Sequence, residues 1–150
     1  MTFQKIIQNY LGLFSALLIL TCNLIYDWSA SIDMNKVMDK SIDISSISFG
    51  FLLAVLAILV QANNEAIIRI RESGNYPTLI SLNKKAVISC GLLIIAALIF
   101  IGFDLSSSKA SLFNHSVRNI FDSICLSILV HQLIVVFMFL DIFYAIVKED

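Results

Sequence analysis

Three polar residues interrupt an apolar stretch near the C-terminus at a spacing that could carry chemistry. Ser123, Ser127 and His131 follow one another at four-residue steps. Each step rotates about 40° around an α-helix, so the three side chains share one narrow stripe. Such a stripe can hydrogen-bond to a neighbouring helix or line a path for water and ions.

Both interpretations of this stripe stay open at the level of sequence. Hydroxyl and imidazole groups commonly bond neighbouring helices in membranes, which favours packing. A pore lined by Ser123, Ser127 and His131 requires several copies, because one subunit with one polar stripe cannot enclose a channel. The pore interpretation therefore predicts a homo-oligomer.

The sequence offers little else to an enzyme. It shows no acidic pair, no nucleophile beside a base and no phosphate-binding loop. Cys22, Cys90 and Cys125 lie in apolar runs, away from any Cys or His at metal-ligand spacing. We therefore predict no catalytic residues, no metal site and no cofactor. The net charge of −1 gives no basic field for direct nucleic-acid binding.

Composition places these residues in a membrane protein. The chain has 150 residues, enough for one domain, of which 59% are hydrophobic and 14% charged. Soluble proteins average about 25% charged residues. A spanning helix needs about 20 mostly apolar residues, and lipid tolerates only segments whose backbone hydrogen bonds close internally. The sequence predicts an all-α integral membrane protein with four transmembrane helices, at about 6–28, 44–72, 84–103 and 119–147.

The first apolar segment must also be considered as a signal peptide. Lys5 precedes the apolar run 11–20, and Cys22 follows Thr21 in a weak likeness to a lipoprotein cleavage site. The apolar run continues to Tyr26, which favours an uncleaved spanning helix.

Lysine and arginine residues set the expected orientation. Six lie at the termini and in the loop after the second span, and four lie in the other two loops. The positive-inside rule then puts the N- and C-termini in the cytoplasm and the loop 28–43 outside.

The second span is expected to continue past the membrane surface. Glu65, Arg69 and Glu72 fall on one helix face, and Gly74 is typical of a helix end. We predict one helix over 44–72 that projects into the cytoplasm. Its projecting end is either a solvated helix terminus or a docking element for a partner.

Short motifs occur after the second span and in the last one: residues 68–76 read IRIRESGNY, residues 127–131 read SILVH, and the tail ends KED. In these motifs the chain resembles the RexB family of membrane components of phage exclusion and abortive infection systems. The resemblance covers the chain in outline from about residue 48 onward, through short motifs and apolar sequence. It implies a multi-pass protein of the bacterial inner membrane that forms an oligomeric ion channel when a cytoplasmic sensor protein detects phage.

On that resemblance, two groups of residues acquire roles. The turn after the second helix would be the surface on which a cytoplasmic activator acts, with Arg69, Arg71, Glu72 and Tyr76 as its candidates. The stripe Ser123, Ser127 and His131 would line the pore.

Two alternatives remain beside the channel. Small multidrug exporters have a similar size but need an acidic residue deep in the membrane, and here only Asp141 approaches that position. A non-conducting membrane assembly or immunity protein fits the same sequence. The difference between it and a pore is whether the polar stripe meets protein or water.

Overall fold

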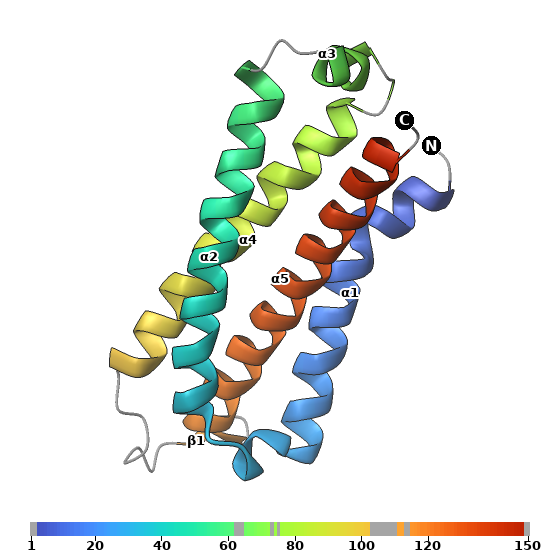
Figure 1. Cartoon of the computed structure of the whole chain (residues 1–150). Coiled ribbons are helices and arrows are strands. Elements are labelled where there is room, and N and C mark those ends of the chain that lie inside the picture. Colours follow the sequence, from blue (N-terminus) through green and yellow to red (C-terminus); the bar gives the residue numbers. More distant parts are fainter. Residues whose placement is uncertain are drawn as a thin grey trace.

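The computed structural model describes the backbone of residues 3–61, 65–72, 74, 76–102, 111–112 and 115–148, with side chains placed for 10–61, 65, 68, 71–72, 74, 76–102 and 116–145. Four long helices make up most of it (Figure 1). The elements in chain order are α1 (Phe3–Tyr26), the 3-10 helix η1 (Trp28–Ser31), α2 (Met34–Gln61), α3 (Glu65–Glu72), α4 (Tyr76–Gly102), β1 (Ser111–Leu112), β2 (His115–Ser116) and α5 (Val117–Lys148).

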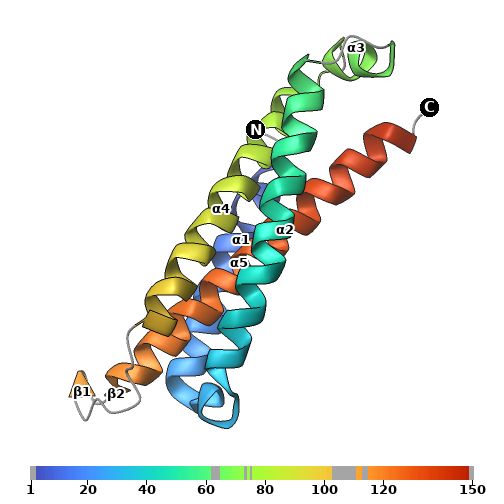
Figure 2. The same cartoon turned by 60° about the vertical axis from the view of Figure 1, so that its left-hand side comes forward.

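The helices pack in the order α2, α4, α5, α1. The α4 helix packs against both α2 and α5, while α1 packs along α5. The α1 helix begins and α5 ends at the end of the bundle that carries α3 (Figure 1). The 3-10 helix η1 and the short strands β1 and β2 lie at the opposite end (Figure 2). Figure 2 shows the last turns of α5 leaning away from α2. The two helices have little direct contact with each other.

The long helices have the length and composition of membrane spans. Among the described residues, the helical segments Met34–Gln61, Tyr76–Gly102 and Val117–Ala145 are long and apolar enough to cross a membrane, and Tyr10–Tyr26 is a shorter apolar helix. Large apolar side chains are exposed on every one of them, as in Phe14, Ile47, Ile95 and Phe137. A soluble protein rarely exposes so much apolar surface, so the chain is a multi-pass membrane protein.

The interior has two apolar clusters with a polar layer between them. Leu52, Leu79 and Phe139 belong to the cluster nearer α3, and Met38 and Phe100 to the one nearer η1. Between the two clusters, Ser45 on α2, Gln132 on α5 and Cys90 on α4 are joined by hydrogen bonds. This layer ties three helices together near the middle of the bundle.

The second helix starts earlier than the sequence predicted. Residues 34–43 were expected in a loop, but α2 begins at Met34. Asp33 accepts a hydrogen bond from the backbone N–H of Lys36 and caps this end of the helix. Met34 and Met38 lie one turn apart and pack into the core, which explains why this charged segment is helical.

The prediction of one continuous helix over 44–72 is wrong. The guanidinium of Arg71 donates a 3.0 Å hydrogen bond to the backbone oxygen of Leu59. On a continuous helix these residues would stand about 18 Å apart along the axis, so α3 does not continue the axis of α2. The α4 helix in turn begins at Tyr76, where a turn was expected. Pro77 fits there because the first helical turn needs no N–H from it.

The remaining predicted boundaries agree more closely. The first and fourth spans were expected at 6–28 and 119–147, and the structure has Phe3–Tyr26 and Val117–Lys148.

A polar seam between the first and last helices

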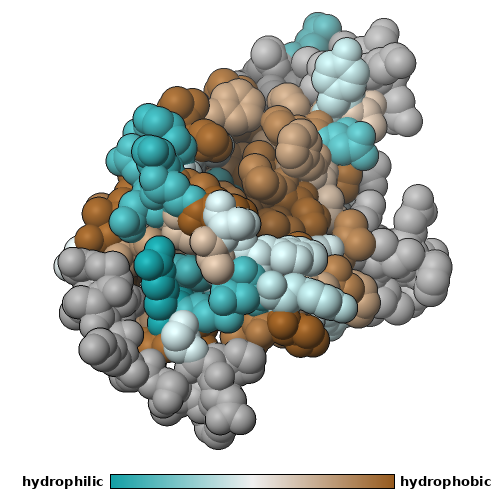
Figure 3. All heavy atoms as spheres, turned by 90° about the horizontal axis from the view of Figure 1, so that it is seen from below, coloured by the Kyte–Doolittle hydropathy of each residue, from teal (hydrophilic) through white to brown (hydrophobic). Residues whose placement is uncertain are grey.

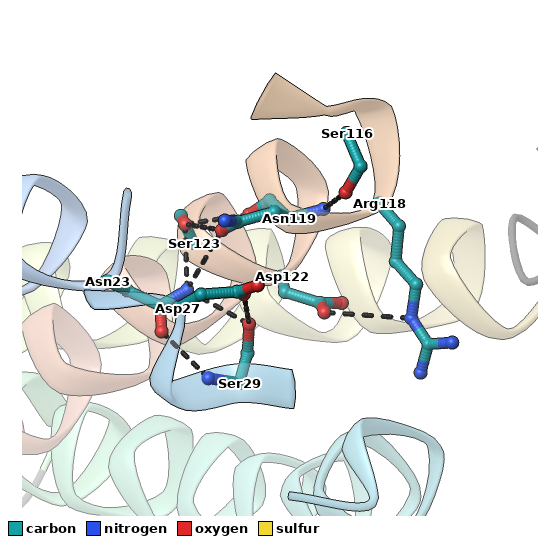
Figure 4. A network of polar contacts seen from close by, with 8 residues as sticks. All are labelled: Asn23, Asp27, Ser29, Ser116, Arg118, Asn119, Asp122 and Ser123. Atoms are coloured by element: carbon teal, nitrogen blue, oxygen red, sulfur yellow. Dashed lines mark hydrogen bonds and ion pairs between the residues drawn. The ribbon is translucent and has the colours of Figure 1, made fainter. Parts of the chain in front are cut away.

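A hydrogen-bond network joins α1 to α5 near the end of the bundle that carries η1 (Figure 4). Asn23 of α1 donates from Nδ2 to Oγ of Ser123 at 2.8 Å and, more weakly, to Oδ1 of Asn119 at 3.5 Å. The Ser123 hydroxyl in turn donates to the backbone oxygen of Asn119 at 2.7 Å. Asn23 and Ser123 are both buried. Their polar groups therefore satisfy one another between two apolar helices.

The same asparagine also organises the turn that follows α1. Its Oδ1 accepts a 2.9 Å hydrogen bond from the backbone N–H of Ser29 in η1. Asp27 takes a left-handed conformation with φ 50° just before η1, a geometry that aspartate tolerates better than most residues. Asn23 thus links the end of α1, the turn and the start of α5.

A buried carboxylate lies beside this network. Asp122 is almost fully buried, and its Oδ2 is 3.8 Å from Nε of Arg118, which is half exposed. The two residues stand four apart on α5, a spacing at which side chains on a helix are neighbours. Asp122, Arg118 and Asp27 border a small cavity of about 190 Å³ at this end of the bundle. Figure 3, seen from this end, shows hydrophilic side chains gathered within a hydrophobic surround.

The other two residues of the predicted stripe, Ser127 and His131, lie further along α5. Ser127 is mostly buried, and its hydroxyl donates to the backbone oxygen of Ile124 in its own helix. His131 is half-buried opposite Gly12 of α1. A Cβ atom built on Gly12 would come within 2.9 Å of Nδ1 of His131. Only a glycine therefore lets α1 approach the imidazole so closely.

A larger cavity opens at the histidine. It has a volume of about 310 Å³, and its walls come from α1, α4 and α5. The side chains in the wall that carry polar groups are those of Tyr10, Lys85, Ser89 and His131. Among the described residues, Oγ of Ser89 and Nδ1 of His131 have no hydrogen-bond partner although both atoms are buried. We call this space the His131 cavity.

The predicted stripe is therefore present, and its members Ser123 and His131 meet α1 of the same chain. Asn119, Ser123 and His131 all lie along the α1–α5 seam, between the small cavity near Asp122 and the His131 cavity. We call these residues together with Asn23 and Ser127 the polar seam. The serines of the stripe meet protein in a single chain, as the packing interpretation expects.

The residues predicted as an activation surface have a structural use. Arg71 donates to the backbone oxygens of both Leu59 and Val60, and the Tyr76 hydroxyl makes a longer contact with Leu59 O at 3.4 Å. These are carbonyls of the last turn of α2, which have no partner within their own helix. The positive charge also suits the negative end of the helix dipole. Glu72 is exposed, and the side chain of Arg69 lies outside the described residues.

Sequence reasoning did not find the partners of the stripe. Asn23 stands alone in an apolar run, where a polar side chain costs free energy unless it is paired. Its position was therefore a signal that it needs a polar partner on another helix. Gly12 carries no comparable signal, because glycine is common in membrane helices.

Comparison with known proteins adds no further identification: no protein-family model, no curated protein and no solved structure matches this chain.

Proposed function

We propose that this protein is a four-span effector of the bacterial inner membrane that conducts ions when activated and thereby depolarises the cell. Both termini would lie in the cytoplasm, and α1, at 24 residues, would be the first span. The observation that carries the proposal is the polar seam, a row of polar side chains between two cavities in the interior of an apolar bundle.

In this function α1 covers the polar stripe of α5. Among the long helices, α1 packs against α5, so it can move with less loss of packing than α4, which packs against two helices. With α1 in place, Ser123 and Ser127 are buried and His131 is half-buried against α1. If α1 moves away, the stripe becomes a free polar face, and the stripes of several copies in a homo-oligomer would line a common pore.

Activation would start at the α3 end of the bundle. The resemblance to RexB-like proteins supports antiphage defence as the setting and a cytoplasmic sensor protein as the trigger. Arg71 and Tyr76 join α3 and the start of α4 to the last turn of α2. A partner that binds Glu72 and its neighbours on α3 would disturb the hydrogen bonds at this junction.

The first test is membrane potential after brief induction of the protein, read with a voltage-sensitive dye. It is run with the protein alone and with any neighbouring gene product. Rapid depolarisation before loss of membrane integrity supports conduction. Its absence under both conditions, with the protein expressed and inserted, contradicts it.

A cross-link across the seam tests the role of α1. Cys22, Cys90 and Cys125 are first replaced by alanine, and Asn23→Cys and Ser123→Cys are then introduced, since these two side chains already meet. Oxidation should hold α1 on α5 and abolish depolarisation, and a reductant should restore it. Each single cysteine variant is the control, and depolarisation that persists through a complete cross-link rules out the covering role.

A second function is favoured by one observation. Ser123 has no exposed surface and its hydroxyl is hydrogen-bonded within the chain. This is what a non-conducting membrane assembly or immunity protein requires, with the seam serving only to hold α1. That function predicts no depolarisation in either the reduced or the oxidised state of the cross-linked variant.

A further inference from the structure

The His131 cavity has the shape of a groove between helices. Its walls come from α1 and α4, and α5 contributes His131, Val135 and Met138. Leu13, Ile88 and Leu92 stand at its edges with about half of each side chain exposed. In a membrane these exposed apolar edges face acyl chains, so the groove is open to lipid.

Polar and apolar groups follow a fixed order along the α4 wall. Lys85 and Ser89 lie one helical turn apart on the same face, and Leu92 follows on the next turn. Lys85 is nearest the α3 end of the bundle. The wall therefore presents a cation, then a hydroxyl, then hydrocarbon over three successive turns. This is the order of groups that a phospholipid presents from its phosphate through its ester linkage to its acyl chain.

The polar atoms at the bottom of the groove lack partners. Ser89 is 3% exposed, and its Oγ has no hydrogen-bond partner among the described residues. The buried Nδ1 of His131, on the facing helix, has none either. A buried polar atom without a partner costs free energy. A hydroxyl in this position can donate to an oxygen atom of a ligand that enters the groove.

We propose that the His131 cavity binds one anionic phospholipid of the surrounding bilayer. Its phosphate pairs with Lys85, a glycerol-ester oxygen accepts a hydrogen bond from Ser89, and one acyl chain lies along Leu13, Leu92 and Val135. Basic pockets between membrane helices are known to take anionic headgroups. The apolar walls and the lateral opening favour a lipid over a soluble anion, because an acyl chain can fill the apolar space that a hydrated phosphate would leave empty. The site does not depend on whether the protein conducts.

Native mass spectrometry of the detergent-purified protein tests this site. Phosphatidylglycerol and phosphatidylcholine of the same chain length are titrated separately. We expect one tightly held phosphatidylglycerol and weaker phosphatidylcholine adducts. Lys85→Gln should lower the phosphatidylglycerol affinity about fivefold. Lys84→Gln is the matched control, because Lys84 is the exposed neighbour that does not border the cavity.

A second pair of variants tests occupancy of the groove itself. Ser89→Leu should fill the cavity and remove the tight adduct, whereas Ser81→Leu, at an exposed position of α4 that does not border the cavity, should leave it. Phosphatidylglycerol carrying a photoreactive acyl chain should label peptides that contain Leu13, Leu92 or Val135. Equal affinity for the two lipids, equal losses in Lys84→Gln and Lys85→Gln, or labelling confined to other helical faces would overturn the proposal. If Ser89→Leu does not fold, the lysine pair and the labelling still decide.

Discussion

Asn23 on α1 and Ser123 on α5, one hundred residues apart in sequence, meet through a 2.8 Å hydrogen bond that is closed to solvent. Both side chains are buried, so neither has water as an alternative partner. The bond therefore fixes both the rotation of α1 and its depth along α5. It also turns a polar stripe that could face a pore into part of a helix interface.

The first prediction concerns the strength of this contact. Asn23→Ala and Ser123→Ala should each destabilise the fold, with a coupling energy of about 0.5–2 kcal/mol in a double-mutant cycle. Unfolding in detergent micelles by sodium dodecyl sulfate measures it. Ser127→Ala paired with Asn23→Ala is the control and should show no coupling, because Ser127 bonds to its own helix. A coupling near zero for Asn23 with Ser123 would contradict the contact.

A second prediction concerns the close approach at Gly12. Gly12→Ala places a methyl group within 2.9 Å of the His131 ring, and overpacking of this kind costs about 1–3 kcal/mol. Gly50→Ala is the control, since nothing lies within 4 Å of its Cβ position. His131→Ala should relieve the clash, so the double variant should be more stable than the sum of the two single effects. Stability unchanged in Gly12→Ala would show that α1 does not approach α5 as described.

The third prediction concerns the α2–α3 junction. Arg71→Gln removes charge-assisted hydrogen bonds to the last turn of α2. Amide hydrogen exchange in α3 should become about tenfold faster, equivalent to about 1.4 kcal/mol. Glu72→Gln changes the charge of an exposed neighbour and should leave exchange unchanged. Equal exchange in the two variants would show that Arg71 does not hold α3.

A fourth prediction concerns Gln132. This side chain is 2% exposed, accepts from Ser45 and donates to Cys90. Gln132→Leu leaves the Ser45 hydroxyl without a partner and should cost about 1–3 kcal/mol. Adding Ser45→Ala removes the orphaned group and should recover most of that loss. If the second substitution recovers nothing, the cost comes from packing and the hydrogen bond carries little.

The fifth prediction is a pH dependence at the start of α2. Hydrogen bonds from the Lys36 side chain and backbone lower the pKa of Asp33. A lowered pKa stabilises the folded state above the unfolded value of about 3.9, and this contribution is lost as the pH falls through the folded pKa. The Lys36 amide resonance should titrate with a midpoint below 3.9 in NMR. Asp33→Asn keeps an acceptor and should remove this titration, and a midpoint at or above 3.9 in the unaltered chain would contradict the cap.

Much of the fold was predictable because lipid leaves few choices. Apolar runs of this length in a bilayer must be helices, so α1 and α5 were found within a few residues of their ends. The ion pair of Arg118 and Asp122 follows from their spacing, since residues four apart on a helix are neighbours. Both relations are local, because they depend on residues close in sequence and not on how the helices pack.

The errors arose where a distant contact decides the structure. Residues 34–43 read as a loop because they carry four charged side chains, yet the burial of Met34 and Met38 against α4 and α5 makes them helical. Residues 62–72 include good helix formers, so the sequence predicted that the second helix continues through them. The hydrogen bond from Arg71 to the backbone oxygen of Leu59 instead requires α3 to lie beside the end of α2.

The sequence by itself determined that the chain enters a membrane as helices and that Ser123, Ser127 and His131 share one face, because composition and helical periodicity are local properties. Tertiary structure alone decided what that face meets. Asn23 and Gly12 come from a helix about one hundred residues away, and their place opposite the stripe depends on how the helices pack. The His131 cavity arises the same way, since its walls belong to three helices and no single one encodes it.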